Sequence, residues 1–188
     1  MNVFHYKQFD IQQDHAAMKV GTDCDLLGAM TPCPVTTSQV SSPNILDIGT
    51  GTGVLALMMA QRFPTAHITA VEIDDNAIID AQANFAASPF SDRISLHHTS
   101  FQDFLTAASP AGYSCIICNP PYFDKSMECP DLGRSRARHS SSLPFDILAQ
   151  GAYELLADGG FFTVCIPPEV LETFQKECLF AGFTTKEM

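Results

Sequence analysis

Apolar runs alternate with amphipathic stretches along most of the chain, and Gly, Pro or Asp separates many of them. The apolar runs have strand length, and the stretches between them are long enough for helices. We expect strands at residues 44–48, 67–72, 93–98, 113–118 and 161–166, with a further strand beginning at 182–184. We expect helices at residues 23–30, 53–63, 74–87, 101–107, 145–156 and 168–181.

The strict alternation of strand and helix predicts the fold class. Such chains form a parallel sheet with helices on both faces, and right-handed crossovers make it doubly wound. We therefore predict a Rossmann-like, mostly parallel α/β domain over residues 1–188. In it, residues 1–43 form an N-terminal cap with a helix, and residues 44–188 form the core. Ligands of such sheets bind at the carboxyl ends of the strands.

Composition indicates the cellular compartment and the redox state of the cysteines. No apolar run approaches the roughly 18 residues of a membrane span, and the N-terminus lacks the apolar stretch of a signal peptide, so we expect a cytoplasmic protein without a membrane partner. Seven cysteines are scattered through predicted elements, which favours reduced thiols. Cys115 and Cys118 have zinc-like spacing, but residues three apart lie on opposite faces of a strand, so we expect no metal.

The charge is −11, from 10 basic and 21 acidic residues, and argues against broad nonspecific binding to a polyanion. A local basic patch is still present at Arg134, Arg136, Arg138 and His139. These residues form either a solvated surface loop or a contact for a nucleic-acid substrate.

A glycine-rich turn follows the first predicted core strand. Gly49, Gly51 and Gly53 let the backbone turn sharply and approach a ligand closely. A dinucleotide fingerprint would need glycine at position 54, which is Val54; this departure favours S-adenosylmethionine (SAM), which has no pyrophosphate. Asp47 is expected either to orient this turn or to meet the SAM ammonium. Glu72 ends the second strand, where a carboxylate can accept both ribose hydroxyls. Alone, the turn also fits an ordinary strand-to-helix loop.

A rigid loop, Asn119-Pro120-Pro121-Tyr122, comes directly after the fourth strand, 70 residues after Gly49. An exocyclic or amide nitrogen is planar and must become pyramidal before it can attack a methyl group. The Asn119 side chain and the Pro120 backbone offer two carbonyl acceptors for its hydrogens, which also stabilise the developing positive charge. Pro120 and Pro121 stiffen the loop. Tyr122 supplies a face on which a substrate base or amide stacks. Without its context, the loop is a plain turn.

Together the two motifs resemble those of SAM-dependent amino-methyltransferases. Further stretches are similar to the bacterial methyltransferases that modify N6 of the adenine beside the anticodon of a valine tRNA. These stretches are residues 7–9, 14–23, 26–29, 55–62, 118–123 and 160–162.

The resemblance implies SAM as cofactor, tRNA as partner and a flipped adenine as the methyl acceptor. Asn119, Pro120 and Tyr122 would then carry the reaction, while Pro121 and the basic patch help to hold the substrate. The turn over residues 19–22, with Lys19 and Thr22, would cover the methionine end of SAM, and Thr22 is a good N-cap for the helix that follows.

At two points we expect this chain to differ from the family it resembles. In this family an acidic residue beside the adenine usually ends the third strand; Ser100 stands there, and Phe101 either packs on the adenine or belongs to the core. The family sheet has seven strands, so the chain is expected to lack the last ones.

Three alternatives stay open. A protein-glutamine N5-methyltransferase also suits the Asn119 loop, but its relatives have a separate N-terminal helical domain, and about 40 residues precede the first core strand here. A DNA adenine methyltransferase would need a target-recognition domain, for which the sequence gives no sign. A non-catalytic SAM- or RNA-binding protein would not need an intact motif from Asn119 to Tyr122.

Overall fold

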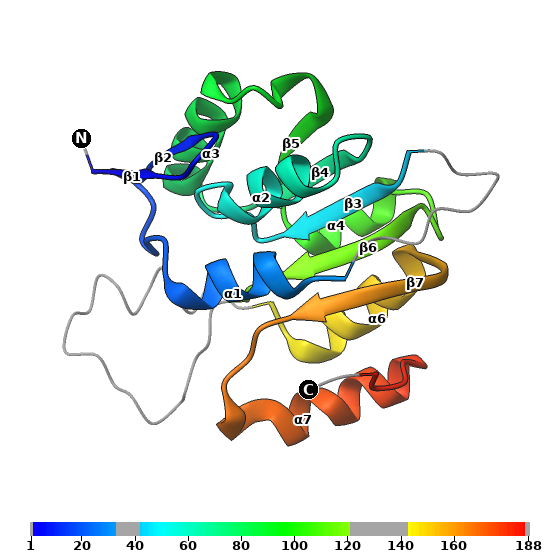
Figure 1. Cartoon of the computed structure of the whole chain (residues 1–188). Coiled ribbons are helices and arrows are strands. Elements are labelled where there is room, and N and C mark those ends of the chain that lie inside the picture. Colours follow the sequence, from blue (N-terminus) through cyan, green and yellow to red (C-terminus); the bar gives the residue numbers. More distant parts are fainter. Residues whose placement is uncertain (1, 33–41, 121–142, 187–188) are drawn as a thin grey trace.

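Five parallel strands form the central sheet of the computed structural model, which describes residues 2–32, 42–120 and 143–186. The strand order is β5-β4-β3-β6-β7 (Figure 1). Their bounds are β3 Asn44–Ile48, β4 His67–Glu72, β5 Ile94–His98, β6 Tyr113–Cys118 and β7 Leu156–Val164. The predicted doubly wound, Rossmann-like sheet is confirmed.

The sheet reverses its winding direction between β3 and β6. From β3 the chain adds β4 and β5 on one side, and then crosses to add β6 and β7 on the other. Ile48 at the end of β3 is in register with Val71 on β4 and with Cys118 on β6. The residues that follow these three strands therefore meet at one edge of the sheet, beside the switch point where such folds bind ligands.

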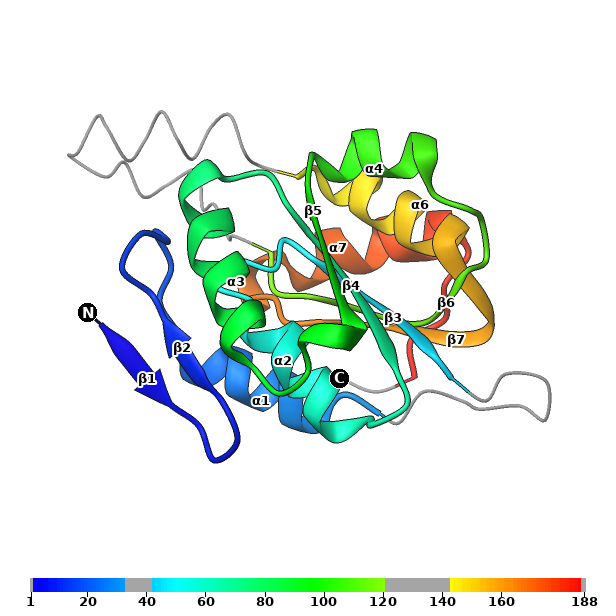
Figure 2. The ribbon, with the colours of Figure 1, turned by 90° about the horizontal axis from the view of Figure 1, so that it is seen from above.

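In the part of the chain that the structure describes, helices cover both faces of the sheet (Figure 2). Helices α1, α2 and α3 lie on one face, and α4, α6 and α7 lie on the other. Their bounds are α1 Thr22–Met30, α2 Val54–Arg62, α3 Asp75–Ala87, α4 Phe101–Ala107, α6 Phe145–Leu155 and α7 Pro168–Ala181, with a short 3-10 helix η1 at Ser91–Arg93. Alternate residues of each central strand face the two cores, because side chains alternate along a strand.

The two cysteines with zinc-like spacing illustrate this alternation. Cys115 packs in the core under α2, whereas Cys118 packs in the core under α6. Both side chains are buried, and burial raises the pKa of Cys115 to about 12. Both are free cysteines, as the prediction of reduced thiols requires. The described residues hold no group of three His, Cys, Asp or Glu that fits a metal ion.

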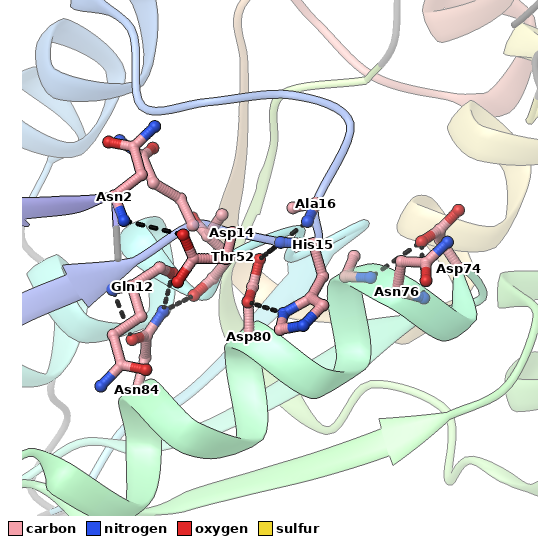
Figure 3. A network of polar contacts seen from close by, with 12 residues as sticks. Asn2, Gln12, Asp14, His15, Ala16, Thr52, Asp74, Asn76, Asp80 and Asn84 are labelled. Carbon is pink, nitrogen blue, oxygen red and sulfur yellow. Dashed lines mark hydrogen bonds and ion pairs between the residues drawn. The ribbon is translucent and has the colours of Figure 1, made fainter.

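An N-terminal hairpin, which the sequence did not predict, lies outside the sheet. Strands β1 Val3–His5 and β2 Asp10–Gln12 pair antiparallel and lie against α3. Two side chains of α3 clamp this segment (Figure 3). Asn84 exchanges hydrogen bonds with the Gln12 backbone at 2.7 and 2.8 Å. The Asp80 carboxylate accepts the backbone amides of His15 and Ala16 at 2.9 and 2.7 Å.

Two further expectations near the C-terminal end are wrong. The helix expected at 145–156 is confirmed to within one residue, but the strand expected at 161–166 begins earlier, at Leu156, and ends at Val164. Its pairing with β6 has an irregular register between Tyr113 and Cys115. No strand begins at 182–184 in the described chain. Instead, Gly182 takes a left-handed φ of 111° and ends α7, and the Phe183 amide bonds back to the Cys178 carbonyl at 2.9 Å.

Within the described ranges, none of the helices is both long enough and apolar enough to cross a bilayer.

Candidate active site

The glycine turn between β3 and α2 lies at the switch-point edge. The amides of Gly49 and Thr50 donate to the Val71 carbonyl at 2.9 and 3.0 Å, which fixes the turn to the end of β4. All three glycines have positive φ, at 68°, 57° and 86° for Gly49, Gly51 and Gly53. A Cβ on Gly53 would lie 2.4 Å from the Phe85 ring, so this glycine allows α2 and α3 to pack closely. Among the described residues, a Cβ on Gly49 or Gly51 would meet no atom within 4 Å, so open space lies above that part of the turn.

Asp47 lies beneath the turn and is fully buried. Its Oδ2 accepts the Thr50 hydroxyl at 2.6 Å and the Ala56 amide at 3.1 Å, whereas its Oδ1 has no hydrogen-bond partner in the part of the chain that the structure describes. Burial raises the pKa of Asp47 to about 7, although these two hydrogen bonds act in the opposite direction. Of its two expected roles, this geometry favours orienting the turn over direct contact with a ligand ammonium.

Glu72 connects the end of β4 to the same turn. Its Oε2 accepts the Gly51 amide at 2.8 Å, and its Oε1 accepts the amides of Ile73 and Asp74, each at 2.8 Å. These contacts hold the carboxylate at the sheet edge, beside the open space above Gly51. A carboxylate oxygen has more than one acceptor site, so Glu72 keeps capacity for ligand hydroxyls.

Ser100 is engaged by the helix that follows β5. As the N-cap of α4, its hydroxyl accepts the Asp103 amide at 3.0 Å and donates to the Asp103 carboxylate at 2.7 Å. Phe101 is buried in the core under α4 and α6. Ser100 therefore caps a helix. Of the two positions expected for Phe101, the structure shows packing in the core.

Asn119 and Pro120 follow β6 and lie at the same edge. The amide nitrogen of Asn119 donates to the Asp23 carboxylate at 2.9 Å and lies 3.0 Å from the Cys24 sulfur. Pro120 is buried. The expected roles of Pro121, Tyr122, Arg134, Arg136, Arg138 and His139 fall on residues outside the described part of the chain.

The N-terminal segment approaches this edge through the start of α1. The Lys19 ammonium donates to the Gln13 backbone carbonyl, and the Gln13 side chain accepts the Val20 amide at 2.8 Å. The expected capping role of Thr22 is wrong: the N-cap is Gly21, whose extended backbone lets its carbonyl accept the Asp25 amide at 3.2 Å. Thr22 is the first residue of the helix. The contacts of Asp23 and Cys24 with Asn119 were not predicted, although Asp23 ends a stretch that carries the family resemblance.

The residues present fit SAM. Open space above Gly49 and Gly51 leaves room for a ligand against bare backbone. Glu72 offers a carboxylate beside that space from the end of β4, and Asn119 follows β6, on the other side of β3. A sugar with two hydroxyls would suit the acceptor capacity of Glu72.

Several solved structures share this fold. P. horikoshii TYW2, solved in complex with MeSAdo, has a TM-score of 0.63 at 16% identity over 93% of this chain and 58% of that one. The precorrin-6y C5,15-methyltransferase of Geobacter metallireducens has a TM-score of 0.60 at 11% identity, over 93% and 75%. At these identities the likeness concerns the fold alone. The model of the Methyltransferase small domain family matches residues 33–166. Fold and family model together define a Rossmann-like, SAM-dependent methyltransferase.

Curated relatives narrow this class to one family. The tRNA1(Val) (adenine(37)-N6)-methyltransferase of Bacteroides thetaiotaomicron is 48% identical over 170 residues, which are 90% of this chain and 68% of that protein. The enzyme of that name from Vibrio parahaemolyticus is 41% identical over 98% of this chain and 74% of its own length. The chain belongs to the family of tRNA1(Val) (adenine(37)-N6)-methyltransferases.

Proposed function

We propose that this protein transfers a methyl group from SAM to N6 of the adenine at position 37 of a valine tRNA, in the cytoplasm. The observation that carries the proposal is the position of Asn119. It lies at the switch-point edge with the glycine turn and Glu72, in a chain 48% identical to a relative named for this reaction. No metal is part of the proposed reaction.

Two residues act on the target nitrogen in this proposal. The Asn119 side chain and the Pro120 backbone accept the two hydrogens of the adenine amine, which favours a pyramidal nitrogen with an available lone pair. The same acceptors stabilise the positive charge that develops on nitrogen. The proton leaves for solvent after transfer, so no general base is required.

The other site residues hold the reactants in line. SAM supplies an electrophilic methyl group on a positively charged sulfur. Glu72 holds the ribose hydroxyls, Asp47 fixes the glycine turn, and the Lys19–Thr22 turn covers the methionine end. Tyr122 is proposed to stack on the flipped adenine. Alignment of the methyl group with the nitrogen then contributes much of the rate.

The choice of acceptor is tested by offering alternatives to one preparation. Purified protein with methyl-labelled SAM is incubated separately with total tRNA lacking this modification, with unmethylated DNA and with a glutamine-bearing protein fraction. Label in tRNA alone supports the proposal. Label in protein would indicate the glutamine N5 reaction, and label in DNA would indicate a DNA adenine methyltransferase. No label in any acceptor, with SAM bound, would indicate a binding protein.

A further inference from the structure

Helix α1 reaches across the edge of the sheet to the Asn119 amide. Its first turn places the Asp23 carboxylate 2.9 Å and the Cys24 sulfur 3.0 Å from Asn119 Nδ2. Ninety-six residues separate Asp23 from Asn119, so the contact is a product of the fold. The contact joins the N-terminal segment to Asn119, the residue proposed to accept a hydrogen of the substrate amine.

These contacts distinguish the two ends of a nearly symmetric group. An asparagine amide can turn over, exchanging a carbonyl oxygen for an NH2 group of similar size. A carboxylate accepts hydrogen bonds but donates none, so it selects the orientation in which nitrogen faces α1. The Cys24 thiol favours the same orientation as a weak acceptor; burial raises its pKa to about 11, so it stays protonated near neutral pH. The carbonyl oxygen of Asn119 is then directed away from Asp23.

The first turn of α1 is itself held in place. A Cβ on Gly21 would lie 2.5 Å from Asp23 Oδ1, so the carboxylate lies close over the backbone of the N-cap. The Tyr6 hydroxyl donates to Asp25 in the same turn. At the other end of the helix, the Arg62 guanidinium donates to the backbone carbonyls of Gly28 and Thr31. Asp23 is therefore presented by a helix fixed at both ends.

We propose that Asp23, assisted by Cys24, is a positioning residue that orients the Asn119 amide so that its carbonyl oxygen accepts from the substrate amine. This inference rests on the proposed function, because it assigns a role to that oxygen. It predicts that Asp23 changes turnover through Asn119 and leaves SAM binding unchanged. A wrongly turned amide would present NH2 to the amine, replacing an acceptor with a donor.

A double-mutant cycle tests this dependence. Single-turnover methylation is measured for wild type, D23A, N119A and D23A/N119A, at saturating SAM. We expect D23A to slow turnover about tenfold to a hundredfold, the range of a hydrogen bond to a charged group. The double variant should be no slower than N119A, with the Kd for SAM unchanged in all four. D23N keeps an acceptor oxygen and should recover part of the rate. The inference would be overturned if the rate reductions of D23A and N119A multiplied in the double variant, or if D23A were as fast as wild type.

The matched control is D92A, which removes an exposed carboxylate from η1, before β5 and so at the opposite edge of the sheet. Its rate should equal that of wild type. A second measurement needs no methyl acceptor. The side-chain amide resonances of Asn119, assigned by their loss in N119A, should shift and exchange faster with solvent in D23A but not in D92A. Unchanged resonances in D23A would refute the orientation even in a protein that methylates nothing, whereas a failed acceptor test alone would refute only the proposed function.

Discussion

The Glu72 carboxylate accepts a hydrogen bond from the Gly51 amide at 2.8 Å, which joins the end of β4 to the glycine turn after β3. The residue that is proposed to hold the ribose thus also fixes the backbone that faces the cofactor. Cofactor binding and the shape of the turn are coupled through this one side chain.

Substituting Glu72 should weaken SAM binding without unfolding the protein. E72A removes the acceptor for the ribose hydroxyls and the partner of Gly51, and hydrogen bonds to charged groups each contribute about 1.5–3 kcal/mol. We expect the Kd for SAM, measured by calorimetry, to rise about tenfold to a hundredfold. E154A is the matched control, since Glu154 is exposed near the C-terminal end of α6. A Kd in E72A equal to that of E154A would contradict the ribose role.

Substituting alanine for Gly53 and for Gly51 should distinguish a glycine needed for helix packing from one needed for the approach of SAM. In G53A the left-handed φ and the contact with Phe85 both oppose a methyl group, and we expect a loss of about 2–4 kcal/mol in the free energy of unfolding. In G51A only φ is strained, so the loss should be about 1–2 kcal/mol, but the methyl group enters the space proposed for SAM. Urea unfolding and calorimetry give both quantities. Equal destabilisation by G53A and G51A, or a Kd for SAM in G51A equal to that of wild type, would contradict these separate roles.

The free energy of unfolding should depend on pH through Asp47. Its folded pKa of about 7 lies above the ordinary 3.8, so the native state keeps a proton that the unfolded chain releases. Stability from this group therefore falls as pH rises from about 4 to about 7, and is constant above that range. Three pKa units correspond to at most about 4 kcal/mol. The difference in unfolding free energy between wild type and D47N, measured from pH 4 to 8, should decline over this window; a difference that does not vary with pH would exclude the raised pKa.

Much of the fold could be predicted because the core strands are buried runs with clear boundaries. Strands β3, β4 and β6 were predicted to the residue, since polar or turn-forming residues flank each apolar run. The β1–β2 hairpin could not be predicted in this way. Its strands have three residues each, too few for a periodic pattern, and Asn84, 72 residues from Gln12, holds it in place.

The candidate site shows the same division between local and long-range signals. The glycine turn and Glu72 follow from local sequence, and register brings them together. The Asp23–Asn119 contact depends on where α1 packs, which no local pattern encodes. Ser100 also carries a local signal: a serine three residues before an acidic residue is typical of a helix N-terminus, and its hydroxyl caps α4.

The basic patch should account for much of the affinity for tRNA in this acidic chain. Arg134, Arg136 and Arg138 are three of its ten basic residues, whereas the Arg62 and Arg93 guanidinium groups donate to backbone carbonyls within the fold. Replacing the three arginines with glutamine should weaken tRNA binding and flatten its dependence on salt by about two to three units of the log–log slope. Nitrocellulose filter binding at several salt concentrations measures both. An unchanged slope would dismiss the patch, and K176Q in α7 is a suitable single-charge control.

The central claim is that this chain methylates an adenine nitrogen through Asn119, and one measurement tests it most directly. Wild type and N119A are each incubated with SAM and valine tRNA from a strain lacking the modification, and the digested nucleosides are analysed by mass spectrometry. We predict N6-methyladenosine at position 37 with wild type. With N119A, which should still bind SAM, we predict at least about a hundredfold less product, as for loss of a transition-state hydrogen-bonding group. No N6-methyladenosine from wild type, or an equal yield from N119A, would contradict the account.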